Sequence, residues 1–284
     1  MNPFAISTDS GADLPKEYCK KHEISVLPLP VTLDGVTYTD MDVQEFYQKL
    51  RNGAMPTTSA ANLEDTSALF RGILSQGKDL LHIAFSSGLS SSCNTAFLAA
   101  EQIRAEFPDR TLIVIDSLCA SLGHGLLVHQ AVKRRENGLS IQETAAQIEA
   151  IKGNIVHNFT VDDLHHLHRG GRVSKATAVV GSLINIKPVL HVDDEGHLTA
   201  VGKARGRKAS IQALVNRMEQ QIVGFDNDEI FISHGDCQSD AEYLAELVRQ
   251  KFNIENIMIG FIGPTIGTHS GPGTLALFFQ GSPR

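Results

Sequence analysis

The chain has 284 residues, of which 42% are hydrophobic and 20% are charged, so it can bury a sizeable core and form two domains of ordinary size. Its formal net charge of −7 and its isoelectric point near 5.9 argue against a general nucleic-acid-binding protein, which needs a basic face to release phosphate counterions. The N-terminus has no basic segment followed by an apolar one, and no run approaches the roughly 20 apolar residues that cross a bilayer. We therefore expect a cytoplasmic protein without stable membrane insertion.

Strands and helices alternate over the first half of the sequence. Short apolar runs that end in polar residues or glycine indicate strands, and apolar residues three and four apart indicate the helices between them. The predicted strands and extended segments are 4–10, 24–35, 79–85 and 111–117. The predicted helices are 13–23, 39–53, 63–74, 91–107 and 123–137, with a loop at 54–61. This alternation predicts a parallel, Rossmann-like α/β sheet.

Small polar side chains follow three of these strands, in segments 7–10, 86–91 and 116–121. Ligand sites of doubly wound sheets lie beyond the carboxyl ends of the strands. We therefore expect the three hydroxyl-rich segments to meet at one edge of the sheet, together with the loop that carries Thr57, Thr58 and Ser59.

The pattern changes after residue 152. Six short apolar runs indicate strands at 154–161, 188–194, 196–204, 229–235, 256–263 and 274–280. Helices or their ends are predicted at 162–171, 175–185, 204–223 and 239–252. A polar turn at 193–198 indicates a hairpin, so this second sheet is expected to be mixed. The sequence thus predicts an α/β domain at 1–152, a second α/β domain at 153–284, and a ligand near their junction.

Five serines lie between positions 86 and 92, at a strand-to-helix junction. A helix start needs one capping hydroxyl and a hydrolase needs one nucleophile, so this number favours a set of donors around an anion, with Ser90 at the mouth of the helix. A nucleophile elbow is the alternative, but Ser92 stands where its second glycine belongs. Simple helix capping is the third interpretation.

Two further segments are candidates for the same site. The glycine-rich segment 263–273 presents one titratable side chain, His269, on what is otherwise nearly bare backbone. Arg172 follows a glycine pair that can end a helix and turn a guanidinium toward an anion. For both, an incidental surface position is the alternative.

A basic run, Lys203, Arg205 and Arg207, stands out in an acidic protein. It is either a solvated helix start or a docking patch for a phosphate-handling partner. No metal site is expected, because the four cysteines lack metal-binding spacing and three histidines at 165–168 are too crowded to face one ion. No nucleotide-binding loop occurs either.

Eight motifs, in order from about residue 5 to residue 279, resemble those of the DegV family of bacterial fatty-acid-binding proteins. They are TDSGADLP, MPTTSAA, SSGLSSSCNTA, DSLCASLGHG, LHRGGRVS, LINIKPVLHVDDEG, KARGRKA and IGPTIGTHSGPG. The resemblance implies a two-domain α/β protein that encloses a fatty acid. It also implies a carrier that presents the carboxylate to a separate fatty acid kinase, for phosphorylation to acyl phosphate in phospholipid synthesis.

By the same resemblance, the carboxylate ligands are Thr58, Ser90 and His269, with Arg172 as a supporting charge. Ser91 replaces a glycine of the family pattern and is counted with the site. The resemblance implies no cofactor besides the bound lipid and no enzymatic activity of the chain alone. A serine-dependent lipid ester hydrolase acting through Ser90 is the alternative function. Segment 176–190 is a plausible wall of the acyl tunnel, although a plain core helix has the same pattern.

Overall fold

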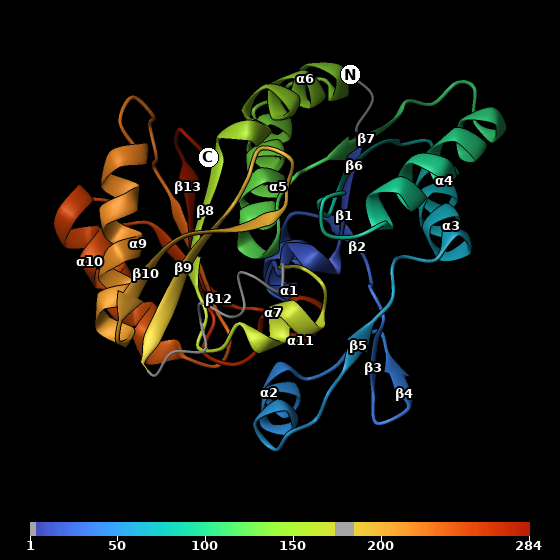
Figure 1. Cartoon of the computed structure of the whole chain (residues 1–284). Helices are drawn as coiled ribbons and strands as arrows, with labels where there is room; N and C mark the ends of the chain where they lie inside the picture. The colour runs from blue at the N-terminus through green and yellow to red at the C-terminus, as the bar shows by residue number, and fades with distance from the viewer. Residues whose placement is uncertain (1–3, 174–184) are drawn as a thin grey trace.

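The computed structural model describes residues 4–173 and 185–284. The first half contains a parallel sheet with the strand order β2-β1-β6-β7 (Figure 1). Its strands are β1 (Phe4–Asp9), β2 (Ile24–Leu27), β6 (Asp79–Ala84) and β7 (Leu112–Asp116). All six residues of β6 are buried, as expected for a central strand that is covered on both faces. The predicted parallel α/β sheet is confirmed.

Helices cover both faces of this sheet. One layer consists of α3 (Leu63–Leu74) and α4 (Ser92–Glu106), and the other of α1 (Lys16–Lys21), α5 (Ser121–Glu136) and α6 (Ile141–Ile151). A short 3-10 turn, η1 (Ser10–Ala12), follows β1. The sequence analysis did not predict α6, although its start carries a complete capping box between Ser140 and Glu143.

A small antiparallel sheet interrupts the first half. It contains β3 (Val31–Leu33), β4 (Val36–Tyr38) and β5 (Thr57–Thr58), and it carries α2 (Val43–Arg51). The expected loop at 54–61 is therefore partly a strand, because Thr57 and Thr58 pair with Thr32 and Val31 of β3. This pairing fixes the direction of the Thr58 side chain, which a loop would leave variable.

The second half contains a six-stranded mixed sheet with the order β10-β9-β8-β13-β11-β12. The strands are β8 (Ile155–Thr160), β9 (Ile186–Val192), β10 (Leu198–Arg205), β11 (Ile230–His234), β12 (Ile257–Phe261) and β13 (Leu275–Gln280). The helices are α7 (His165–Arg169), α9 (Arg207–Gln221), α10 (Gln238–Phe252) and α11 (Pro264–Ser270), and η2 (Lys152–Asn154) precedes β8. All six predicted strands and the mixed character of the sheet are confirmed. The helix predicted at 175–185 lies almost entirely outside the described residues.

Helix α5 packs between the two sheets, where it shares one hydrophobic core with strands of both (Figure 1). Its glycines allow the close approach, because a Cβ at Gly123 would lie 2.2 Å from the His157 ring of β8 and one at Gly125 would lie 2.7 Å from the Ala12 carbonyl oxygen. The change from one sheet to the other falls between the end of α6 and the start of β8. Since α5 belongs to both cores, the division into domains 1–152 and 153–284 stays a prediction.

The β9–β10 hairpin ties the second half to the first. Ser86 donates a hydrogen bond to the carbonyl oxygen of Gly196 at the hairpin tip, over 2.9 Å. Gly88 makes room for this contact, since a Cβ there would lie 2.7 Å from the Glu195 carbonyl oxygen. The loop after β6 is thus held against the second sheet. In the described parts of the chain, no helix is both long and apolar enough to cross a membrane.

Candidate ligand-binding site

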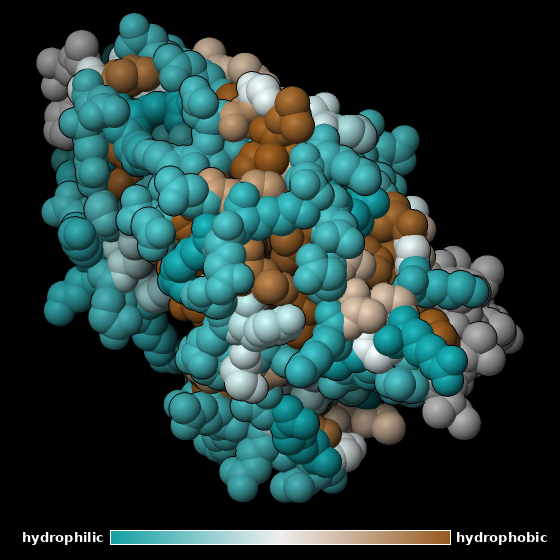
Figure 2. Space-filling model, turned by 90° about the vertical axis from the view of Figure 1, so that its left-hand side faces the viewer, coloured by the Kyte–Doolittle hydropathy of each residue, from teal (hydrophilic) through white to brown (hydrophobic). Residues whose placement is uncertain are grey.

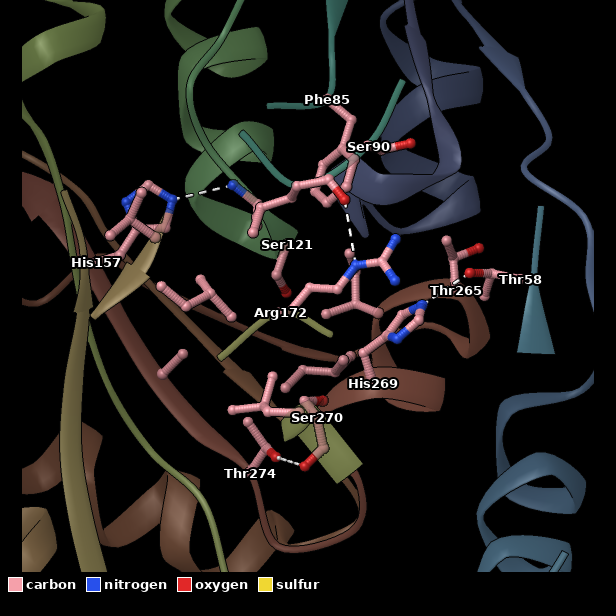
Figure 3. A pocket seen from close by; sticks show the side chains of 18 of the residues that line it. Thr58, Phe85, Ser90, Ser121, His157, Arg172, Thr265, His269, Ser270 and Thr274 are labelled. Atoms are coloured by element: carbon pink, nitrogen blue, oxygen red, sulfur yellow. Dashed lines mark hydrogen bonds between the residues drawn. The ribbon is translucent and has the colours of Figure 1, made fainter. Parts of the chain in front are cut away.

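A cavity of about 190 Å³ lies between the two halves of the chain, and Figure 3 shows the side chains around it. Its walls come from loops of the first sheet, from β5, from α11 and from strands of the second sheet. All five residues predicted for ligand binding line it: Thr58, Ser90, Ser91, Arg172 and His269. The structure therefore brings together side chains from four separate sequence segments, and their role as ligands stays a prediction.

His269 and Thr58 form the closest polar pair at the cavity mouth. The Thr58 Oγ1 lies 2.7 Å from the His269 Nε2 (Figure 3). Gly170 lies against the other side of the imidazole, where a Cβ would come within 2.2 Å of the His269 Nδ1. The glycine pair before Arg172 thus has a second use, because its first member makes room for the histidine.

The His269 imidazole is neutral at neutral pH. Burial, together with the nearby guanidinium groups of Arg172 and Arg169, lowers the pKa of His269 to about 4. The ring therefore acts as a hydrogen-bonding group rather than as a cation.

The serines of segment 86–92 make different contacts. Ser92 accepts a hydrogen bond from the Ala61 backbone N–H over 3.0 Å, and its hydroxyl lies 2.9 Å from that of Ser90. Ser90 also accepts from the Ser92 backbone N–H over 3.2 Å. Ser86 holds the hairpin, whereas Ser90 and Ser91 face the cavity. Capping alone does not account for the cluster, since Ser91 occupies the N-cap position of α4 without a side-chain capping bond.

Arg172 reaches across the cavity mouth toward the serine loop. Its Nε donates to the Leu89 carbonyl oxygen over 3.2 Å (Figure 3). Its Nη1 donates to the Gly170 carbonyl oxygen. The guanidinium is therefore fixed in place by backbone carbonyls, and it supplies a positive charge next to Ser90.

Apolar side chains form most of the remaining wall. They come from the serine loop, from α7, from four strands of the second sheet, from the segment before α11 and from α11 itself: Phe85, Leu89, Phe159, Leu167, Val192, Leu198, Ile262, Ile266, Ala276 and Phe278. Of the wall predicted at 176–190, residues 176–184 lie outside the described residues. The described remainder, Asn185–Leu190, does not line the cavity, and Val192 of the same strand does.

Several polar cavity residues escaped the sequence analysis. Ser121 and Ser233 lie on the wall at the start of α5 and in β11, and Ser270 follows His269 with a buried hydroxyl that has no partner among the described residues. His157 also lines the cavity, with its Nε2 accepting from the Ala120 backbone N–H over 3.1 Å. Segment 116–121 was flagged as hydroxyl-rich, but nothing in the sequence distinguished Ser121 from its neighbours.

The basic run does not behave as one unit. Lys203 and Arg205 are exposed on β10, which is an edge strand rather than the expected helix start. Arg207, however, begins α9 and forms an ion pair with Asp240 over 2.8 Å, so the expectation of a solvent-facing side chain is wrong for it. Figure 2 shows this side of the molecule, around α9 and α10, as a mostly hydrophilic surface with separate apolar patches.

Within residues 4–173 and 185–284, no three histidine, cysteine, aspartate or glutamate side chains are grouped as a metal ion would require.

The described residues thus form two α/β layers that share helix α5, with a cavity of mixed hydroxyl and apolar character between them. A family model described as an uncharacterised protein of the DegV family matches residues 3–281, and the chain belongs to this family. A DegV domain-containing protein of Clostridium perfringens is 43% identical over 289 residues, which cover 100% of this chain and 99% of the relative.

Two solved structures are similar over nearly their whole length. A fatty-acid-binding DegV family protein from Thermus thermophilus has a TM-score of 0.88 and 31% identity, with 99% of this chain and 100% of that chain covered. DegV from Bacillus subtilis, described as a fatty acid binding protein, has a TM-score of 0.84 and 30% identity, with coverage of 98% and 99%.

Proposed function

We propose that the cavity binds a long-chain fatty acid, with the carboxylate at the mouth and the acyl chain along the apolar wall. The head-group residues are Thr58, Ser90, Ser91, Arg172 and His269. The observation that carries the proposal is the group of hydroxyl side chains beside Arg172 and His269 in a cavity whose remaining wall is mostly apolar. Relatives with the same fold, from Thermus thermophilus and Bacillus subtilis, are described as fatty acid binding, which supports the same ligand class here.

The hydrogen bonds around Ser90 favour an anionic ligand. Ser92 already accepts from Ala61, so its own hydroxyl hydrogen is available to Ser90, which also accepts from the Ser92 backbone N–H. With both bonds accepted, the hydroxyl hydrogen of Ser90 is left for the cavity. A carboxylate oxygen, which can only accept, is the matching partner.

Thr58 is prepared in the same way. If the His269 hydrogen is on Nε2, the imidazole donates to Thr58, and the Thr58 hydroxyl is free to donate to a ligand. Two donors of this kind, with the Arg172 charge beside them, hold a carboxylate without a bidentate ion pair. The acyl chain supplies most of the affinity, because each buried methylene contributes about 0.8 kcal/mol.

We further propose that the protein presents this carboxylate to a separate, ATP-dependent kinase in the cytoplasm, and that it has no turnover of its own. In that reaction a carboxylate oxygen attacks the γ-phosphorus of ATP, the bond to the β,γ-bridging oxygen breaks, and acyl phosphate and ADP leave. Hydroxyl donors keep the carboxylate oxygen more nucleophilic than a tight arginine pair would.

A surface depression next to the cavity gives such a kinase a place to act. It has a volume of about 340 Å³ and shares Thr58, Arg172 and His269 with the cavity. Arg169 also lines this depression and adds a second positive charge. Two guanidinium groups beside the reacting carboxylate suit a phosphoryl group in transit.

The alternative, a serine-dependent ester hydrolase, requires a general base next to Ser90, and the described contacts of Ser90 include no histidine. The described side-chain partner of the Ser90 hydroxyl is Ser92, and His269 contacts Thr58 instead. A nucleophilic serine needs a histidine within hydrogen-bond reach, oriented by a third group.

Mass spectrometry of the lipid released by denaturing the purified protein tests the proposed function. We expect roughly one C14 to C18 fatty acid per chain. In the proposed complex this ligand lies where domains 1–152 and 153–284 meet. A nucleotide or a sugar at one per chain, with no lipid, would overturn the proposal. Release of acid from activated esters, with label on Ser90, would favour the hydrolase.

A further inference from the structure

A second polar point lies on the cavity wall, apart from the five head-group residues. Ser121 and Ser233 both line the cavity and are 4% and 0% exposed. Their hydroxyl oxygens are 2.9 Å apart, and the Ser121 oxygen is 2.6 Å from the Oδ2 of Asp13. The three side chains form a short hydrogen-bonded row that ends on a carboxyl group.

The backbone is distorted to build this row. Asp13 and Ser121 both adopt the left-handed conformation, with φ of 51° and 53°, which is rare outside glycine and asparagine. Gly263 completes the arrangement, since a Cβ there would lie 2.6 Å from the Asp13 Oδ1. Strained backbone of this kind persists where the surrounding structure requires a particular side-chain position.

The direction of the hydrogen bonds follows from the carboxylate. An ionised carboxylate only accepts, so Ser121 gives its single hydroxyl hydrogen to Asp13. The hydrogen between the two serines must then come from Ser233. Both hydroxyl hydrogens point along the row, and only oxygen lone pairs face the cavity. Ser121 is the sole partner of the Ser233 hydroxyl among the described residues.

The Ser121–Ser233 row therefore has the opposite hydrogen-bonding character to the cavity mouth. The mouth offers donors and suits a carboxylate, whereas the row offers acceptors and suits a donor such as a hydroxyl group. From this contrast we infer that the preferred ligand of the cavity is a hydroxy fatty acid, whose chain hydroxyl donates to the Ser233 oxygen. The inference rests on the proposed function and narrows its ligand class.

The test compares octadecanoic acid with its 3-hydroxy, 10-hydroxy and 12-hydroxy derivatives, by displacement of a fluorescent fatty acid from the whole protein. Burial raises the pKa of Asp13 to about 7, so the assay is run at pH 8, where the carboxyl group is largely ionised. We expect one hydroxy acid to bind at least fivefold more tightly than octadecanoic acid, which corresponds to about 1 kcal/mol.

Ser233→Ala should reduce this affinity ratio to about one. Ser233→Cys keeps the volume but accepts hydrogen bonds weakly, so it should have the same effect and replaces the alanine variant if that variant does not fold. Ser117→Ala is the control, since Ser117 is equally buried but bonds only to its own loop, and it should keep the ratio.

Three results would decide against the inference in different ways. If octadecanoic acid binds and no derivative is preferred, the inference fails and the proposed function stands. If a preference exists but survives both Ser233 variants, the acceptor row is not its cause. If none of the four acids binds, the proposed function fails, and the inference fails with it.

Discussion

The imidazole of His269 and the hydroxyl of Thr58 lie 2.7 Å apart although 211 positions separate them in the chain. One comes from the end of α11 and the other from the two-residue strand β5. Their contact lies where the cavity meets the surface depression, and it gives the head-group site a defined geometry.

Ser90→Ala should weaken fatty-acid binding about tenfold to a hundredfold. It removes one donor to a charged ligand, which typically costs about 1.5 to 3 kcal/mol. Displacement of a fluorescent lipid measures the effect, and circular dichroism checks that the fold is retained. Ser87→Ala is the matched control, because Ser87 is exposed on the same loop. Equal affinity of the Ser90 variant and wild type would remove Ser90 from the site.

Gly170→Ala should displace His269 and weaken ligand binding by a similar factor. The backbone at Gly170 has an ordinary helical conformation, with φ of −73°, so the damage comes from the new methyl group against the imidazole. Gly72→Ala is the control, since a Cβ there meets nothing within 4 Å and should stabilise α3. Isothermal titration with a fatty acid would show the prediction to be wrong if both variants bind alike.

Ligand binding should depend on pH through His269. A bound carboxylate favours the charged imidazole, so binding raises the pKa of His269 from about 4 and takes up a proton. Affinity should therefore increase as the pH falls from about 8 toward 5.5, where a carboxylic acid is still ionised. His269→Gln should flatten this profile, and a flat profile in the wild type would count against the contact.

Stability should depend on pH through Asp13. Its folded pKa, raised to about 7 by burial, exceeds the ordinary value of 3.8, so the folded state holds a proton that the unfolded state has lost. The resulting stabilisation is full below pH 3.8 and is lost as the pH rises through about 7. Urea unfolding between pH 5 and 8 should show wild type losing stability relative to Asp13→Asn. Parallel profiles of the two proteins would contradict the assignment.

Reversing Lys203 and Arg205 to glutamate should leave fatty-acid binding intact and slow acyl-phosphate formation by a cognate kinase. Both side chains are exposed on the edge strand β10, and docking through them should weaken as salt rises above about 0.1 M. The double variant Lys20→Glu/Lys21→Glu changes the net charge equally on α1 and serves as control. Unchanged kinase turnover in the β10 variant would show that Lys203 and Arg205 are solvent-exposed residues without a docking role. Arg207 is left out, because its ion pair with Asp240 makes it a structural residue.

Local sequence signals determined the order and type of most elements. The fully buried runs of β6 and β11 and the caps Asp42 and Asn62 all act within a few residues, so they can be recognised without the fold. The meeting of hydroxyl-rich segments at one sheet edge was also predictable, because parallel neighbouring strands place their carboxyl ends side by side. Helix α6 is recognisable in the same way, because Ser140 and Glu143 form a capping box at its start.

Other features depended on contacts between distant segments, which no local pattern encodes. Pairing of Thr58 with Val31 makes a strand of an expected loop, and the ion pair with Asp240 engages the Arg207 charge within the protein. Neighbouring serines have different roles for the same reason: Ser86 donates a hydrogen bond to the β9–β10 hairpin, whereas Ser90 lines the cavity. The sequence by itself determined which segments supply polar groups. Only the packing of two sheets around α5 decided which of those groups face the cavity and which are hydrogen-bonded within the protein.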